Sequence, residues 1–187
     1  SVYKALAGST PKGLLQHVHG EVNWVKGGFV DSRVTGELTG FEMQANNFIP
    51  GVKYINADFD IRKNLSFINL HSENLYLDYP RLFRDPLQFE WFDGQIQVDK
   101  LEDGFAISSG VLSLNNAEIR TSTQFSLWFP ADKSLSPRIE SVSTLHDLDL
   151  RRVPKYLPAG VLKPTLVAYL DSSLNQGRLV RGDVVYN

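Results

Sequence analysis

The chain has 187 residues, of which 42% are hydrophobic, 19 are basic and 21 are acidic. This length suits one domain with its own core, and a net charge of -2 argues against a nucleic-acid-binding surface, which is usually strongly basic. Cysteine is absent, which excludes disulfides, thiol catalysis and cysteine-ligated metals. The longest uncharged run, 104–117, is too short and too polar to span a bilayer. Because Met43 is the only methionine and the chain begins at Ser1, we expect a fragment of a longer protein.

Apolar and polar residues alternate along most of the chain, which is the pattern of β-strands with one apolar face. Val18, Gly20, Val22 and Trp24, for example, alternate with polar residues before a turn at 26–28. The same pattern predicts strands over 33–40, 54–61, 65–70, 75–79, 87–91, 96–98, 105–114, 117–129 and 138–150. Between these strands we predict a break at 71–74, a turn at 93–94, and a turn at 115–116 that pairs its two flanking strands.

The spacing of apolar residues changes only near the end of the chain. Five of them fit one face of a helix: Leu162, Leu166, Tyr169, Leu170 and Leu174. Pro164 suits the first turn and Gly177 a position past the end, so we predict one helix over about 164–175. A single helical turn within 153–158 precedes it. No linker divides the chain, so we expect one domain over 1–187, with a β section 1–150, a helical segment 151–177 and a returning strand 178–187.

Two kinds of polar cluster could carry chemistry. His17, His19 and Glu21 alternate on one strand face, an arrangement that could hold a metal ion. Same-face carboxylate pairs could serve acid–base catalysis: Asp58 with Asp60, and Asp147 with Asp149. Polar residues on a solvated strand face need no ligand, however, and no phosphate-binding or nucleophile motif accompanies them. We therefore expect no catalytic residue, no metal and no cofactor, and a protein that is not an enzyme.

The C-terminal region carries the most specific motifs. Tyr156-Leu157-Pro158 is followed by the apolar stripe around Tyr169-Leu170-Asp171 and then by Leu174-Asn175-Gln176-Gly177. Together they resemble the tyrosine-leucine-proline segment, amphipathic helix and terminal glycine of the YhdP-type, AsmA-like envelope proteins. Pro11-Lys12-Gly13 resembles the family's entry to a strand, and 70–87 resembles a segment that joins two of its sheet sections. The resemblance extends over nearly the whole chain.

The resemblance implies a mainly β fold, in which a curved antiparallel sheet forms an open, β-taco-like groove with one C-terminal amphipathic helix. It also implies a periplasmic portion of an inner-membrane-anchored protein in a diderm bacterium, conducting phospholipids toward the outer membrane and contributing to outer-membrane lipid homeostasis. The chain would be an interior segment, with phospholipid acyl chains and neighbouring groove segments of the same protein as its partners. Membrane contact would be made only by parts outside it.

In such a groove the apolar strand faces would hold acyl chains without a fixed register, so that lipids slide. The candidate lining residues are Val18, Val22, Trp24, Val34, Leu38, Ile55, Phe59, Ile61, Leu87, Phe89, Trp91, Ile119, Phe125, Leu127 and Phe129. The helix is expected to pack its stripe of Leu162, Leu166, Tyr169, Leu170 and Leu174 over the apolar end of the sheet.

Two alternatives stay open at this point. A ligand-free structural β domain would show the same alternation, because a packed core and an open groove are patterned identically. A carbohydrate-binding β-sandwich would also be aromatic, but it would place its rings on a polar face. Here Phe59, Phe89 and Phe125 alternate with polar residues on the apolar side.

Overall fold

A computed structural model describes residues 10–46, 49–132 and 134–187. Its main element is one sheet of ten antiparallel strands, which confirms the predicted fold class. The strands are β1 (Lys12–Val25), β2 (Gly28–Met43), β3 (Gly51–Arg62), β4 (Leu65–Asp78), β5 (Leu87–Leu101), β6 (Gly104–Ser109), β7 (Leu112–Asn115), β8 (Arg120–Pro130), β9 (Arg138–Asp149) and β10 (Arg178–Tyr186). They lie side by side in chain order, except that short β7 pairs with β5 and β8 next to β6.

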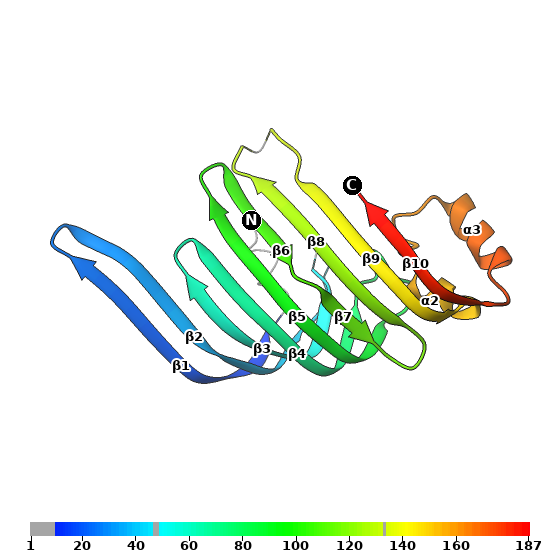
Figure 1. Ribbon diagram of the computed structural model, residues 1–187, viewed down its shortest axis with the longest axis horizontal. Helices are drawn as coiled ribbons and strands as arrows, with labels where there is room; N and C mark the ends of the chain where they lie inside the picture. Colours follow the sequence, from blue (N-terminus) through cyan, green and yellow to red (C-terminus); the bar gives the residue numbers. More distant parts are fainter. Residues whose placement is uncertain (1–9, 47–48, 133) are drawn as a thin grey trace.

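Antiparallel succession gathers the turns at two edges of the sheet. Turns at 26–27, 63–64 and 102–103, together with residues 131–132 and 134–137, form what we call the tip edge. Segments 79–86, 116–119 and 150–177 lie at the opposite, base edge. Figure 1 shows the β1–β2 hairpin projecting at one end of the sheet and helix α3 (Pro164–Ser173) beyond β10 at the other.

A line of bulges crosses the sheet and shifts the apolar phase of its strands. In β4, Ser72 and Leu75 are both buried although they are three residues apart, and Asn74 between them has a left-handed φ of 58°. Gly40 in β2 and Tyr54 in β3 have φ of 59° and 63°, and all three residues line one shallow hollow. Such bulges bend a strand and increase its twist. The three therefore form a crease across β2, β3 and β4, which keeps one face apolar on both of its sides.

Two of the predicted breaks are wrong, because the strands continue through them. β4 continues through 71–74 and β5 continues through 93–94, where His71 pairs with Asp93 and Leu70 with Gly94. Gly94 serves a close approach rather than a turn, since a Cβ there would lie 2.6 Å from Leu112 Cδ2 of β7. Asn74 marks a change of apolar phase inside continuous β4, whereas Gly94 lies in phase with Phe92 and Ile96 inside continuous β5.

The core lies on one face of the sheet, near the base edge. One buried cluster consists of Leu75, Leu87, Phe89, Ile119 and Leu148, and a second consists of Ala57, Leu70 and Leu112. Ile55, Phe92 and Leu114 pack against both clusters and join them. A single sheet buries such residues only where other segments cover its face.

Two segments far apart in the sequence supply that cover. Phe83, from the loop between β4 and β5, packs on the first cluster together with Val153 and Tyr156 of the short helix α2 (Val153–Tyr156). The predicted helical turn within 153–158 is thus confirmed, and a 3₁₀ turn, η1 (Leu150–Arg152), leads into it. Gly160 N donates to Leu82 O at 3.0 Å, and a Cβ on Gly160 would collide with the carbonyl oxygen of Arg81. We call segments 79–86 and 150–162 together the cap.

The phase shift in β5 predicts unequal effects for two aromatic residues only two positions apart. Phe89→Ala should lower the free energy of unfolding by about 3–5 kcal/mol, because it empties a buried position. Trp91→Ala should cost less than about 1 kcal/mol, because that side chain is 50% exposed. Urea denaturation of both variants tests this, and equal losses would contradict the phase shift.

Candidate functional site

Apolar residues line up across the strands on the core side of the sheet, which we call the inner face. One line joins Gly36, Phe59, Ile68 and Ile96 through successive cross-strand pairs. A second line, nearer the tip edge, includes Val34 paired with Ile61, and then Val98, Ile107, Leu127 and Ile139. The inner face is therefore mainly apolar across the sheet, from β2 to β9, although Ser66 of β4 pairs with Val98 on the second line.

Burial of the inner face falls from the base edge to the tip edge. At the base, under the cap, Leu75, Leu87 and Phe89 are sealed from water. Toward the tips the same face is open, with Ile61 48% exposed and Ile139 46% exposed. Side chains of this size at half exposure leave a continuous apolar surface that a ligand could cover.

The predicted lining residues divide between these two regions. Leu87, Phe89 and Ile119 lie in the sealed core, and Ile55 packs against it. The others, apart from Trp91, are exposed or half-buried: Val18, Val22, Trp24, Val34, Leu38, Phe59, Ile61, Phe125, Leu127 and Phe129. The open region is thus carried mainly by the tip halves of the strands.

Trp91 departs from the predicted alternation. It pairs with Glu73 of β4 and with Asn115 of β7, while its neighbour Phe92 packs against both core clusters. Trp91 therefore points to the polar outer face. The apolar positions of β5 run up to Phe89 and resume at Phe92, so the apolar phase shifts by one residue between these two phenylalanines.

A hydroxyl patch on the inner face was not predicted from the sequence. Thr121 and Thr123 of β8 alternate with polar residues on both sides, so periodicity gave no sign of which way they face. Thr123 pairs with Leu112 and shares a hydrogen bond of 2.9 Å with Ser143 of β9, and Phe125 pairs with Ser141. The patch interrupts the apolar surface toward β10.

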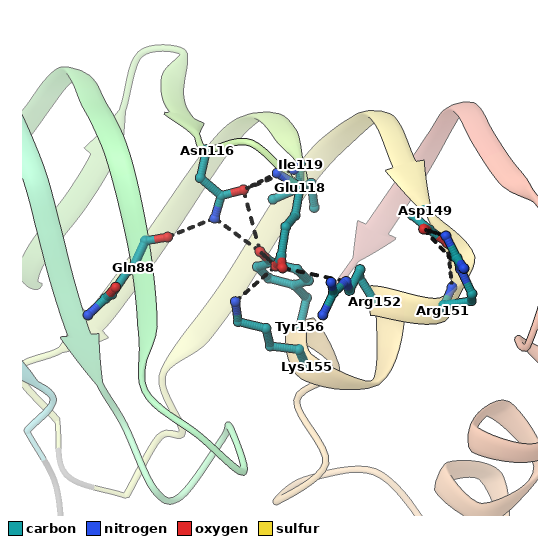
Figure 2. Close-up of polar contacts among 9 residues, drawn as sticks. All are labelled: Gln88, Asn116, Glu118, Ile119, Asp149, Arg151, Arg152, Lys155 and Tyr156. Atoms are coloured by element: carbon teal, nitrogen blue, oxygen red, sulfur yellow. Dashed lines mark hydrogen bonds and ion pairs between the residues drawn. The ribbon is translucent and has the colours of Figure 1, made fainter.

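Figure 2 shows the polar cluster that fixes the cap to the base edge. The Tyr156 hydroxyl donates to Glu118 Oε2 at 2.7 Å and accepts from Asn116 Nδ2 at 3.0 Å. Lys155 Nζ donates to the same Glu118 oxygen at 2.9 Å, and Asn116 Nδ2 also donates to Gln88 O at 2.7 Å. The Tyr156 ring meanwhile faces Phe89, with centroids 6.5 Å apart. The tyrosine of the Tyr-Leu-Pro segment thus joins the core to this cluster.

Two ionisable groups of the cluster are shifted in ways that favour the closed cap. The hydrogen bond from Lys155, and then that from Tyr156, lowers the pKa of Glu118 and keeps it ionised. Burial raises the pKa of Tyr156, which keeps its hydroxyl protonated and able to donate. Charge-assisted hydrogen bonds of this kind are stronger than neutral ones, so the cap is held in place at neutral pH.

The predicted C-terminal helix is present as α3, but it does not cover the sheet. Leu166 is 43% exposed and Tyr169 64% exposed, and no residue of α3 belongs to the core clusters of the described chain. Asp171 instead pairs with Arg84 at 2.8 Å, which ties the helix to the loop between β4 and β5. The expected covering role falls to α2, because its Val153 and Tyr156 reach the core and α3 lies beyond β10 (Figure 1).

The histidines considered as metal ligands lie beside carboxylates along the exposed strand β1. His17 lies 3.0 Å from Glu37, and His19 lies 3.4 Å from Glu21. In the described part of the chain, no group of three or more His, Cys, Asp or Glu could hold a metal ion.

Three of the four carboxylates considered for catalysis are bound by arginines, and the fourth, Asp58, lies 3.9 Å from His71 Nδ1. Hydrogen bonds from Arg62 and Arg33 hold the pKa of Asp60 far below its usual range, and Arg151 lowers the pKa of Asp149 to about 2. Asp147 is bound by Arg120 and Arg178. Carboxylates held ionised in this way are poor proton donors and acceptors near neutral pH. Asp60 and Asp147 bind arginines of neighbouring strands, and Asp149 binds Arg151 in the turn that follows β9.

Comparison with protein families matches the family model described as YhdP protein, over residues 1–187. The chain belongs to the YhdP protein family. At the family level, these are AsmA-like proteins of the cell envelope with a role in lipid transport. No curated protein and no solved structure gave a match to the chain. Among the described residues, no helix is long and apolar enough to cross a membrane.

The Glu118 cluster predicts a specific dependence of stability on pH. Glu118→Gln should lower the free energy of unfolding at pH 7 by about 1–2 kcal/mol, because it removes the charge from two hydrogen bonds. The folded pKa of Glu118 lies below its ordinary value of 4.5, so the ionised carboxylate stabilises above that pH and the benefit is lost as pH falls through the folded pKa. The difference between wild type and variant, measured by urea denaturation from pH 7 to 3, should therefore shrink with acid. A difference constant with pH would contradict the assignment.

The exposure of α3 predicts tolerance to a charge on its apolar stripe. Leu166→Asp should change the free energy of unfolding by less than about 0.5–1 kcal/mol, because that side chain does not reach the core. Val153→Asp, on α2, should cost more than about 3 kcal/mol, because it places a charge against the first buried cluster. Thermal denaturation of the two variants compares them directly, and a large loss from Leu166→Asp alone would restore the covering role to α3.

Proposed function

We propose that this segment of a YhdP-family protein conducts phospholipids through the periplasm, between the inner and outer membranes, and so contributes to outer-membrane lipid homeostasis. The observation that carries the proposal is the inner face, which is mainly apolar from β2 to β9 and open along the tip edge. A soluble protein rarely leaves so wide an apolar surface exposed without an occupant.

The mechanism follows from the direction of the apolar lines. They run across the strands, and thus along the sheet from one side strand toward the other. Burial of an acyl chain on this surface is favourable by about 0.8 kcal/mol of free energy for each CH₂ removed from water. Aliphatic and aromatic contacts favour no single register, so a chain can move along the line without breaking a directional bond.

The cap gives the groove its polarity. Near the base edge Phe83, Val153 and Tyr156 fill the space over the core, so acyl chains cannot pass out on that side. Along the tip edge Ile61 and Ile139 face water. A lipid on the inner face therefore directs its tails toward the cap and its head group toward the tips, where the head group stays hydrated.

In this proposal the chain is one interior section of a longer groove. Both side strands, β1 and β10, have one edge without a partner in the described sheet, which is where neighbouring groove segments of the same protein would join. The whole protein would be anchored in the inner membrane by parts outside this chain, and those parts would make the membrane contacts.

The architecture favours lipid conduction over the two alternatives. A carbohydrate-binding sandwich requires a second sheet against the first, and the described strands form one sheet. A ligand-free domain would bury its apolar face throughout, whereas here the face is sealed only at its base edge.

A charge in the open part of the inner face should block lipid binding without unfolding the protein. Ile61→Asp and Ile139→Asp place a carboxylate among acyl chains but within reach of water at the tip edge, so the fold should survive. Native mass spectrometry of the wild type should show bound phospholipid, and each variant should retain at most about one tenth of that amount.

The control places the same charge on the opposite face. Gln124→Asp, next to Phe125 on β8, should retain the lipid of the wild type. Absence of lipid from the folded wild type, or equal retention by all three variants, would refute the groove.

A further inference from the structure

The row of residues at the open rim of the inner face contains a positive charge. Lys100, near the end of β5, pairs with Phe105 of β6, and Phe105 pairs with Phe129 of β8. The two rings stack with centroids 4.6 Å apart and an interplanar angle of 13°. Lys100 N donates to Asn64 O at 2.7 Å, which fixes this end of β5 against the β3–β4 turn. We call Lys100, Phe105 and Phe129 the rim row.

The charge stands out because the described inner-face positions of the lines on β3 to β9 carry no other. The lines that lie beneath the rim row on β3 to β9 consist of apolar residues and a few serines and threonines. Among the described residues the Lys100 ammonium has no ion pair or hydrogen bond, while its backbone is held by the ladder. An exposed ammonium with no partner in the described chain is free to bind a ligand of opposite charge.

Apart from Lys26, at the end of the projecting β1–β2 hairpin, the other described cations near the tip edge are engaged. Arg33 and Arg62 both bind Asp60, and Lys63 donates to Val30 O. Arg138 lies over the Trp128 ring, 5.3 Å from its centroid, on the outer face. Lys100 is thus the cation best placed to meet a ligand that lies on the inner face.

The nearby carboxylates do not neutralise it. Asp99 accepts from Gln97 on the outer face, and Asp103 lines an outer-face hollow with Arg138. Glu102 is exposed in the turn that follows Lys100. A lysine stem can therefore lie along the phenylalanines of the rim row with its ammonium at the water boundary.

We propose that Lys100 binds the phosphate of the lipid head group, at the point where the head group leaves the inner face for water. This inference rests on the proposed function and adds to it a head-group contact: the acyl chains lie on the apolar lines, and the anionic phosphodiester reaches Lys100 in the rim row. The ammonium supplies a charge-assisted hydrogen bond to phosphate, and because it is a single exposed contact, it holds a passing lipid in orientation without trapping it.

The test separates phosphate from acyl chains by using three probes. Isothermal titration of the full 187-residue chain would use dioctanoyl phosphatidylglycerol, dioctanoylglycerol with the same tails but no phosphate, and inorganic phosphate. Wild type should bind the phospholipid about three- to tenfold more tightly than the diacylglycerol, and should not bind inorganic phosphate measurably. Lys100→Gln should remove that preference and leave diacylglycerol binding unchanged, and Lys100→Arg should keep it. Lys53→Gln, which removes a lysine that lies over the Tyr76 ring, is the matched control and should behave as wild type.

Each other outcome overturns a defined part of the argument. Equal affinity of Lys100→Gln and wild type for the phospholipid would refute the role of Lys100 and leave the groove intact. Binding of inorganic phosphate as tight as that of the phospholipid, lost in Lys100→Gln, would show a free-anion site instead of a head-group contact. Failure of the folded wild type to bind either lipid would refute the proposed function itself.

Discussion

The structure depends on one constraint, which is that a single sheet must present an apolar face with no second layer of equal size to cover it. Hydrophobic burial is the main favourable term in folding, and here it is concentrated at the base edge, where the cap lies over Leu75, Leu87 and Phe89. The tip halves of the strands are then held by their ladders and by outer-face ion pairs such as those of Asp60. The base ends of the strands therefore hold the buried core, and the tip ends of the same strands leave the inner face open.

The crease and the cap together allow a single sheet to keep one apolar face and to bury part of it. The bulges at Gly40, Tyr54 and Asn74 let the strands bend while keeping apolar residues on the inner face. The cap then needs only a few side chains, Tyr156 foremost, to close the base. Tyr156 places its ring on Phe89 and its hydroxyl on Glu118, so one residue of the Tyr-Leu-Pro segment joins the core to the polar cluster. The Tyr-Leu-Pro segment therefore has a structural role, which is to hold the cap against the core.

Some of the site was predictable from the sequence, and the failures share a physical cause. Val34, Ile61 and Leu127 were found because period-two alternation is a local property that needs no knowledge of neighbours. The predicted face of Trp91 is wrong, and so are the predicted breaks at 71–74 and 93–94. Where the apolar phase of a strand shifts depends on how that strand pairs with its neighbours, and the sequence of one strand does not show this pairing. Asn74 and Gly94 are compatible with either a turn or a continuous strand, and only pairing with the next strand decides between them. The same limit applies to Lys100, whose face is defined by its partner Phe105 rather than by its position near a turn.

Residue spacing alone is enough to predict the mainly β fold, the C-terminal helix and its extent, and the apolar character of one strand face, because each depends on the pattern within one element. The sequence also carries the motifs that resemble the YhdP family, and the family match over residues 1–187 agrees with them. Which part of the apolar face is sealed and which part is open depends on contacts between distant segments. Burial depends on what packs against a residue, and the cap is built from segments some seventy positions apart, 79–86 and 150–162. For the same reason α3, which the spacing predicted correctly as a helix, could not be assigned its neighbours from the sequence: an apolar stripe specifies that a helix has a face to bury, and the fold specifies whether that face meets the core.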